Sequence, residues 1–459
     1  GTRPPPPLRR VPRQGDPPSS FGQERLWRAH RADPADTSFN LHYGWRVRGQ
    51  LDARALERAL TGVVRRHAAL RTTFRSDGGG VVQVIHPPPA LRIPEVDLTG
   101  LDAAAREEAA QALSEDEAGR PFDLEQGPLL RTRLVRIGER EHAVLLTLHH
   151  VVTDGWSTGV LMRELSALYQ AYAAGGDAAL VEPEVQYADY AVWQRAWLTG
   201  EVLERQLAYW TAQLAGAPRL ALPTDRPRHP GVRGWAATRS FQLGEELSRA
   251  IRALASREGC TLYMALLAGF QALLALAGGQ EEVSVGTPVA GRTQREVEGL
   301  IGFFTNTLVI RTDLSGAPCF RTLVKRVRET TLAAYAHQDL PFASLVGALR
   351  PGMGAEEMPL FQVVFELEHA RPAQETLRLP GAEVSRLARP PDAKRTLRSE
   401  LRLTMREDGA GIEGTLWYRT ELFDGETIDA MIRGYLALLE GAATDPDRPL
   451  AEIPLPGGS

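Results

Sequence analysis

Cysteine is scarce in this chain of 459 residues, and no cluster of metal-binding side chains is evident in the sequence. Cys260 and Cys319 are the two cysteines, and neither lies in a CxxC or comparable spacing. Isolated thiols of this kind are typical of a protein in a reducing compartment, where they stay free. The sequence therefore predicts no disulfide, no metal site and no thiol-based redox chemistry.

An excess of charge of one sign is also absent, as is any long apolar run. Lys and Arg number 53, Asp and Glu number 57, and the formal net charge is −4, so nothing indicates nucleic acid or an anionic membrane as a partner. No uninterrupted apolar run approaches the ~18–20 residues that span a bilayer. The proline-rich start lacks the apolar core of a signal peptide. We expect a cytoplasmic protein.

The composition is that of an ordinary globular protein, with 43% hydrophobic and 24% charged residues. Residues 1–18 are rich in Pro and Arg and predict a linker. Two units that mix helices and strands follow, at 19–178 and 179–459, because a Gly- and Pro-punctuated passage interrupts the pattern between them. Apolar spacing predicts one continuous helix over 189–213. The fold class is therefore mixed α/β.

The most informative stretch of the sequence is His149–Gly155 (HHVVTDG). It follows an apolar strand-like run and precedes a helix-like run, for which Ser157 is a plausible N-cap. Side chains alternate across a strand, so His149 and His150 should point to opposite sides, one structural and the other free to act as a base. This makes them poor joint metal ligands. Asp154 lies beyond the turn, where it either fixes a histidine tautomer or stabilises the turn through a salt bridge.

This stretch resembles the HHxxxDG motif of nonribosomal peptide synthetase condensation domains, within the chloramphenicol-acetyltransferase-like acyltransferases. Segments similar to the family's other motifs occur in the family's order: Ser20–Trp27 (SFGQERLW), Arg66–Phe74 (RHAALRTTF), Tyr187–Trp193 (YADYAVW), Ile301–Arg311 (IGFFTNTLVIR), His337–Phe342 (HQDLPF) and Pro359–Phe365 (PLFQVVF). Three residues depart from the family's pattern in these segments: Gly22 replaces Ala, Ala68 replaces Glu and Thr305 replaces Val. The resemblance runs from about residue 10 to about residue 440.

The resemblance implies two chloramphenicol-acetyltransferase-like lobes that form a V-shaped pseudo-dimer with a central tunnel. It implies that His150 is catalytic, as a general base or as a group that positions the amine. Gly155 would admit the substrate and offer its backbone N–H, while His149 would support the turn. Asp154 would form a structural salt bridge with Arg292, the last residue of a GTPVAGR segment. We expect four further residues to line the tunnel: Trp156, Ser157, Asn306 and Trp417.

The resemblance also implies the reaction, an amide bond between an upstream acyl or peptidyl thioester and the amine of a downstream aminoacyl thioester. No cofactor would bind directly, since substrates arrive as phosphopantetheine thioesters on donor and acceptor peptidyl carrier proteins, beside an adenylation domain. The opening motif resembles the LCL subtype, which accepts an L-configured donor. We expect a monomer, excised from a longer protein.

Three alternatives remain open. The chain could be a starter condensation domain that attaches a fatty acyl group to the first amino acid. It could be a stand-alone acyltransferase that uses CoA thioesters. It could also be a non-catalytic relative that recruits a partner enzyme, although such relatives usually lose the active-site motif that is intact here. One departure concerns Ala393–Leu401 (AKRTLRSEL), which is longer and more basic than the family's latch segment, so the sequence predicts no latch conformation.

Overall fold

The computed structural model describes residues 5–12, 15–228, 234–353, 358–368, 377–387, 396–409 and 411–453. Its contacts divide the chain into two compact units. The first unit comprises Gly1–Thr199, Ala290–Thr305 and Arg371–Ala393, and the second comprises Gly200–Val289, Asn306–Ala370 and Lys394–Ser459. This differs from the predicted boundary after residue 178, because two later segments of the chain pack with the first unit.

The first unit is built on a mixed sheet with the strand order β11-β1-β6-β5-β4, and a separate pair, β2-β3. Its strands are β1 (Asn40–Gly49), β2 (Thr72–Ser76), β3 (Val81–Ile85), β4 (Glu95–Asp97), β5 (Leu130–Gly138), β6 (Glu141–His149) and β11 (Ala382–Arg386). Its helices are α1 (Phe21–Ala32), α2 (Ala53–Arg66), α3 (Ala103–Gly119), α4 (Gly155–Ala173) and α5 (Tyr187–Trp197).

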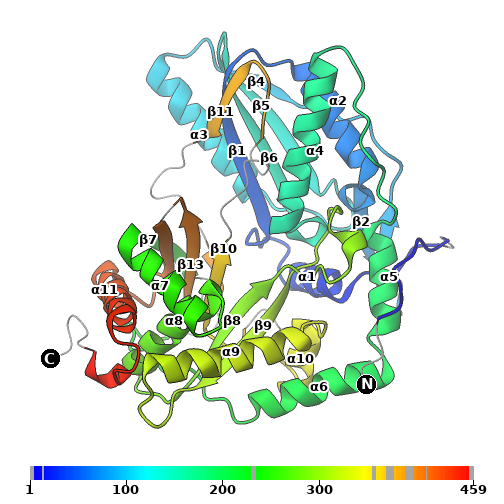
Figure 1. The fold of residues 1–459 in the computed structure, drawn as a ribbon. Helices are drawn as coiled ribbons and strands as arrows, with labels where there is room; N and C mark the ends of the chain where they lie inside the picture. The colour runs from blue at the N-terminus through cyan, green and yellow to red at the C-terminus, as the bar shows by residue number, and fades with distance from the viewer. Residues whose placement is uncertain are drawn as a thin grey trace. The chain divides into compact units, whose positions relative to one another are not determined.

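Strand β6 has apolar side chains on both of its faces. Val144, Leu146 and Leu148 belong to the core that includes α2 and α4, whereas Ala143 and Leu145 pack in the cluster that includes Ala110 of α3. Figure 1 shows α2 and α4 side by side, with α3 across the sheet from them. Because both faces are covered, β6 is a rigid base for the residues that follow it.

The histidine turn leaves the sheet where β6 ends. His149 is the last residue of β6 and is paired with Asn40 of β1, a 3₁₀ turn, η2 (His150–Val152), follows, and α4 begins at Gly155. The N-cap is Asp154, whose carboxylate accepts a hydrogen bond from the backbone of Ser157. The prediction of Ser157 as N-cap is wrong, because the carboxylate three residues earlier caps the helix instead.

The second unit has a sheet with the strand order β12-β7-β14-β13-β10-β8-β9. Its strands are β7 (Gly234–Leu243), β8 (Glu282–Val289), β9 (Asn306–Asp313), β10 (Val363–Glu368), β12 (Thr396–Leu397), β13 (Leu401–Asp408) and β14 (Gly411–Arg419). Its helices are α6 (Gly200–Leu214), α7 (Glu245–Arg257), α8 (Leu262–Gly278), α9 (Phe320–Ala336), α10 (Phe342–Leu349) and α11 (Gly425–Thr444). Helix α8 is almost wholly buried, and a Cβ at Gly269 would lie 2.8 Å from Leu439 of α11, so glycine permits this close helix crossing.

Two sequence-based expectations fail at the edges of the first unit. The helix predicted over 189–213 is two helices, because the chain breaks between α5 and α6 with a positive φ of 50° at Gly200. The described part of the predicted linker packs against α5: Leu8 is 4% exposed, and Trp193 Nε1 donates to the carbonyl of Pro6. Residues 5–12 therefore form part of the unit.

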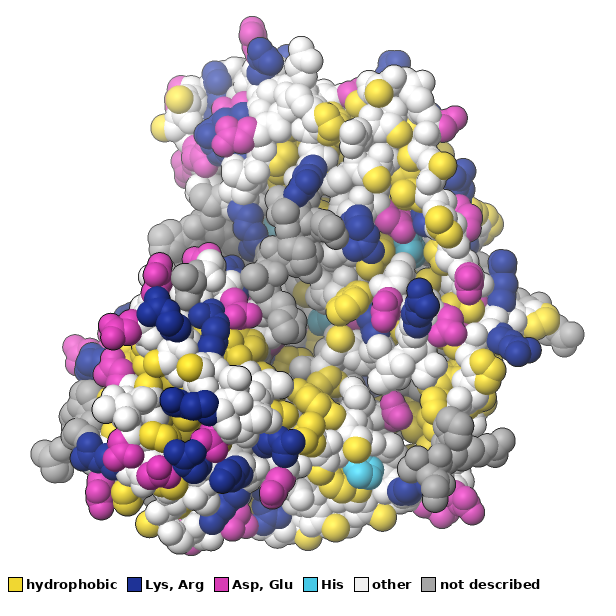
Figure 2. Space-filling view, in the orientation of Figure 1, with side chains coloured by type: hydrophobic (Ala, Val, Ile, Leu, Met, Phe, Trp, Pro, Cys, Tyr) yellow, Lys and Arg dark blue, Asp and Glu magenta, His cyan; other side chains and the backbone are white. Residues whose placement is uncertain are grey.

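The surface carries charges of both signs. On the face seen in Figure 2, acidic and basic side chains are interspersed over each unit, as the small net charge of −4 indicates. Such a surface gives no strong attraction to a polyanion.

The remaining expectations concern membranes, the latch and the arrangement of the lobes. Among the described residues no single helix has the length and hydropathy of a membrane span, and α7 with α8 passes that test only as a pair bent by 105°. Residues 393–395 of the latch segment lie outside the described residues, and β12, which follows them, pairs antiparallel with β7. The V shape and the tunnel stay predictions.

Candidate active site

The first histidine of the motif is a buried structural residue. His149 is 1% exposed and is surrounded by the rings of Phe39, Phe122 and His30, with centroids 5.9–6.3 Å away. Its Nδ1 accepts a hydrogen bond from the backbone N–H of Val151 at 3.1 Å, which fixes the turn. Burial lowers the pKa of His149 to about 3. Its imidazole is therefore neutral at pH 7.

The second histidine has one nitrogen fixed and one available. His150 Nδ1 lies 2.7 Å from the backbone carbonyl of Thr153. A carbonyl only accepts, so Nδ1 carries the proton in this bond and Nε2 of the neutral ring carries the lone pair. Among the described residues, the hydrogen bond of the His150 ring is made by Nδ1, and none is made by Nε2. This is the arrangement that a base or hydrogen-bond acceptor needs.

The surroundings of His150 favour the neutral imidazole. Its side chain is partly buried, and the ring of Phe303 meets it edge to face, with centroids 4.9 Å apart. Burial lowers the pKa of His150, the bond to Thr153 and the charge of Asp154 oppose that shift, and the Arg25 charge adds to it. A lowered pKa keeps the Nε2 lone pair free at neutral pH.

Asp154 stabilises the turn through groups other than the imidazole. Its carboxylate is fully buried. One oxygen, Oδ1, accepts from the backbone of Ser157 at 2.8 Å and from Arg292 at 3.3 Å, and the other accepts from the backbone of Phe304 at 2.9 Å. Of the two roles left open by the sequence, the structure places Asp154 in the salt bridge, while the Thr153 carbonyl holds the tautomer.

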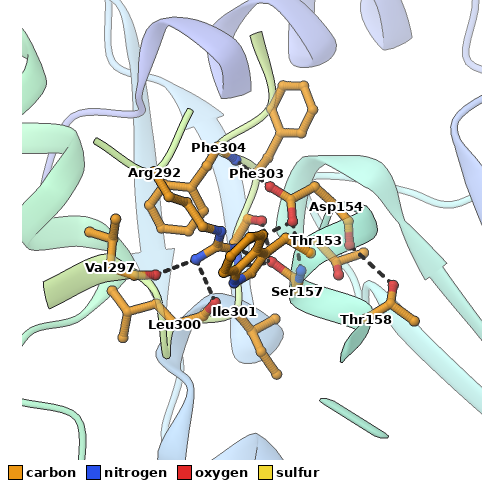
Figure 3. A network of polar contacts seen from close by, with 12 residues as sticks. Thr153, Asp154, Ser157, Thr158, Arg292, Val297, Leu300, Ile301, Phe303 and Phe304 are labelled. Atoms are coloured by element: carbon orange, nitrogen blue, oxygen red, sulfur yellow. Dashed lines mark hydrogen bonds and ion pairs between the residues drawn. The ribbon is translucent and has the colours of Figure 1, made fainter. Parts of the chain in front are cut away.

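Arg292 ties the start of α4 to the segment around residues 297–304 (Figure 3). The guanidinium is 2% exposed and pairs with Asp154. It also donates to the backbone carbonyls of Val297 and Leu300 and to the hydroxyl of Ser157. The guanidinium carbon of Arg292, Cζ, lies 4.0 Å from the centre of the Phe304 ring. A buried charge with this many partners holds its neighbours in one geometry.

Gly155 and Trp156 form the solvent-facing part of this turn. A Cβ built on Gly155 meets no atom within 4 Å, so open space adjoins the first residue of α4. The Trp156 side chain is 50% exposed, and its Nε1 donates to the carbonyl of Glu298 at 2.8 Å. A helix N-terminus offers unpaired N–H groups and a partial positive charge, which suit a developing oxyanion.

Two of the residues expected to line a tunnel, Ser157 and Asn306, form hydrogen bonds with backbone groups. Ser157 is fully buried, and its hydroxyl donates to the carbonyl of Gly302 while accepting from the Gly302 N–H. The Asn306 amide donates to the carbonyls of Gln338 and Leu340 and accepts from the backbone N–H of Phe342. The expectation for Ser157 is corrected, because its side chain is fully buried. Asn306 is only partly buried, so its place along a tunnel stays a prediction. Trp417 is partly exposed on β14, and its role stays a prediction.

Sequence reasoning missed three contributors around His150. The Thr153 carbonyl has no sequence signature, because every residue carries one. Phe303 lies inside a recognised motif, yet only its fold shows that its ring meets the imidazole. Tyr187, also in a motif, donates to the carbonyl of Phe303 at 2.5 Å. Among the described residues, no three His, Cys, Asp or Glu side chains come together as a potential metal site.

Comparison with known proteins gives a consistent family. A model of the condensation domain matches residues 13–457. A linear gramicidin synthase of Brevibacillus parabrevis is 46% identical over 453 residues, which is 98% of this chain and 6% of that protein. Chondramide synthase of Chondromyces crocatus is 41% identical over 451 residues, which is 98% of this chain and 11% of that protein. The chain thus spans a small part of the length of such relatives.

Solved structures share the fold over the whole chain. The X-domain in its complex with OxyB from teicoplanin biosynthesis has a TM-score of 0.89 and 29% identity, with 100% of both chains covered. The first condensation domain of the calcium-dependent antibiotic synthetase, in complex with a substrate analogue, has a TM-score of 0.76 at 20% identity, covering 96% of this chain and 100% of that one. At that identity the second likeness bears on the fold alone.

Proposed function

The chain belongs to the condensation-domain family and has its chloramphenicol-acetyltransferase-like fold, and from that premise we propose that it joins two carrier-bound substrates through an amide bond. The donor is an acyl or peptidyl thioester on an upstream peptidyl carrier protein. The acceptor is the free amine of an aminoacyl thioester on a downstream carrier protein, loaded by an adjacent adenylation domain. Both substrates arrive on phosphopantetheine arms, and the chain binds no cofactor of its own.

In this reaction the acceptor nitrogen attacks the thioester carbon. The C–N bond forms, the C–S bond breaks, and the proton lost by nitrogen ends on the departing thiol. The chemistry needs a neutral amine that is held in line with the carbonyl. Holding two reactants in this way contributes about 7–11 kcal/mol to catalysis, and a well-placed proton acceptor adds about 10²–10⁴-fold.

We assign His150 the role of hydrogen-bond acceptor for the amine. Its Nδ1–H is bound to the Thr153 carbonyl, so Nε2 presents its lone pair to an N–H of the substrate. Burial lowers the pKa of His150, so the imidazole is a weaker base than a free histidine but still accepts a hydrogen bond at neutral pH. Positioning the amine is therefore its main contribution.

Gly155 and the first turn of α4 serve the thioester carbonyl in this proposal. The open space beside the Gly155 Cα lets a carbonyl oxygen approach the backbone. The Ser157 N–H is taken by Asp154, so in this proposal the N–H groups of Gly155 and Trp156 face the negative charge that develops on that oxygen. Trp156, exposed beside them, provides apolar surface for the arriving substrate.

The single observation that carries the proposal is the bond from His150 to Thr153, because it leaves Nε2 unprotonated and unpartnered. The test is a reaction with separate donor and acceptor carrier proteins, each loaded with a defined thioester, followed by mass spectrometry of the acceptor carrier. Wild type should transfer the donor acyl group onto the acceptor. His150→Ala should form no detectable amide while its unfolding transition is retained. Full turnover by that variant contradicts the assignment.

The same assay separates the finer alternatives. An L-configured aminoacyl donor should react and its D-isomer should not, if the chain is of the LCL subtype. Preference for a fatty acyl donor identifies a starter domain. Amide formation from acyl-CoA without any carrier protein identifies a stand-alone acyltransferase.

A second candidate is a recruiting role, favoured by the TM-score of 0.89 to an X-domain that was solved in complex with OxyB. In that case the chain binds a partner enzyme and forms no bond itself. The free Nε2 of His150 and the open Gly155 argue for catalysis. A chain that forms no amide from any loaded carrier pair, but that binds purified OxyB, supports the recruiting role.

A further inference from the structure

The ring of Phe303 fills the space between the histidine turn and α1. It meets His150 edge to face at 4.9 Å and is itself 4% exposed. On α1, a Cβ built on Gly22 would lie 2.9 Å from Phe303 Cε1 and 3.0 Å from Cδ1. Carbon atoms in contact normally stay about 3.5–4.0 Å apart. Gly22 therefore leaves room for this ring and for no additional carbon.

We propose that Phe303 is a positioning residue that sets the orientation of the His150 imidazole, and that the missing side chain at Gly22 is what allows it to do so. The proposal rests on the amide-forming function and assigns His150 a partner that orients it. Phe303 contacts the imidazole, so in this proposal it acts through His150.

The backbone at Phe303 resists a shift that would relieve a clash, because two hydrogen bonds hold the peptide group that joins Phe303 to Phe304. Tyr187 donates to the Phe303 carbonyl at 2.5 Å and lies 2.8 Å from the Ser20 hydroxyl. The next residue, Phe304, donates its N–H to the buried carboxylate of Asp154. A clash at the ring must therefore be relieved by the ring itself or by its contacts.

Helix α1 is equally fixed beside the histidine turn. Ser20 caps it and exchanges hydrogen bonds with Gln23, and the Gln23 amide donates to the carbonyl of Val151 at 3.4 Å. Arg25, one turn further along, lies with its guanidinium carbon 5.9 Å from the centre of the Phe303 ring. The ring is thus held between two fixed elements, and a methyl group at residue 22 would push it against His150.

The test is a set of four proteins: wild type, Gly22→Ala, Phe303→Leu and the double variant. Gly22→Ala should lower the rate of amide formation at saturating substrate by about tenfold to a hundredfold, because a small displacement of a positioned group has effects of that size. The smaller Leu side chain accommodates the added methyl group. The double variant should therefore exceed Gly22→Ala by about twofold or more, instead of showing the product of the two single effects.

Two further readouts separate positioning from simple packing. The pH profile of Phe303→Leu should show its acid limb at higher pH than wild type, since removal of the ring lets water reach His150. In NMR spectra of the ¹⁵N,¹³C-histidine-labelled protein, the His150 ring resonances should shift in Gly22→Ala, with assignment from His150→Ala.

Gly62→Ala is the matched control. Its added Cβ would lie 3.0 Å from Leu168 Cδ1, a contact within the first unit that is nearly as tight as the one at Gly22. Leu168 lies thirteen residues after Gly155 on α4, about 20 Å along the helix. Gly62→Ala should alter neither the His150 resonances nor the pH profile.

The outcomes are distinguishable. Unchanged His150 resonances and unchanged turnover in Gly22→Ala overturn the positioning role. Equal losses in Gly22→Ala and Gly62→Ala also overturn it, because the effect is then one of stability. Absence of amide from the wild type contradicts the proposed function, and the NMR comparison alone then decides the role of Phe303.

Discussion

Replacement of Asp154 by Ala should loosen the start of α4 and the segment around residues 297–304 together. The carboxylate is fully buried and accepts from Ser157, Phe304 and Arg292. Its loss leaves the buried guanidinium of Arg292 without a counter-charge, which costs about 3–5 kcal/mol. Loss of the N-cap by itself costs ~1 kcal/mol. The two costs are not additive, since the same carboxylate makes both interactions.

Hydrogen exchange followed by mass spectrometry measures this locally. Since 1.4 kcal/mol corresponds to about a factor of ten, protection of peptides that cover residues 155–160 and 297–304 should fall at least about a hundredfold in Asp154→Ala. The double variant with Arg292→Met should recover part of that loss, because no buried charge then stays unpaired. Unchanged protection in both peptides, or strictly additive effects of the two substitutions, would refute the reasoning.

Three further predictions follow from the same structure. The pKa of His149 in the folded protein is about 3, below its unfolded value of 6.5. Its contribution to stability is therefore present above pH 6.5 and is lost as the pH falls towards 3, by about 1.4 kcal/mol per pH unit. His149→Asn should remove that part of the pH dependence of the urea midpoint, and an unchanged pH dependence contradicts the assignment. Gly155→Ala should unfold at or slightly above the wild-type temperature, because its Cβ meets no atom and Ala loses less backbone entropy than Gly in a helix. It should form amide about tenfold to a hundredfold more slowly, because a small displacement of the reacting groups has effects of that size; wild-type turnover contradicts close substrate approach there. Asn306→Ala should lower the free energy of unfolding by about 1–3 kcal/mol through its lost backbone hydrogen bonds, and the products should stay the same. An altered KM at unchanged stability would instead identify Asn306 as a substrate contact.

Local patterns in the sequence were enough to locate the histidine turn. The apolar run of β6, the motif HHVVTDG and the apolar face of α4 are contiguous, so periodicity and residue identity place His149, His150 and Gly155 at a strand-to-helix junction. The pairing of Asp154 with Arg292 is not local, and it was available only through the resemblance to a family.

The parts that could not be read from the sequence depend on contacts between distant segments. Short β11 pairs with β1, more than 330 residues earlier in the chain, and no turn signal joins them, so the prediction of two consecutive lobes missed this return. Asn306 lies in a motif and Ser157 lies two residues after one, which suggests substrate contact, yet both side chains form hydrogen bonds with backbone groups. The close approach of Phe303 to Gly22 could not be predicted from the sequence, because the two residues lie in separate motifs that only the fold brings together.

The protonation state of one imidazole tests the central claim most directly. Two-dimensional ¹H–¹⁵N NMR of histidine-labelled protein at pH 7, with assignment from His150→Ala, reports which ring nitrogen carries the proton. The bond to the Thr153 carbonyl predicts a neutral ring that is protonated at Nδ1 and has a free lone pair at Nε2. A ring protonated at Nε2 alone, or a cationic ring at that pH, would contradict it.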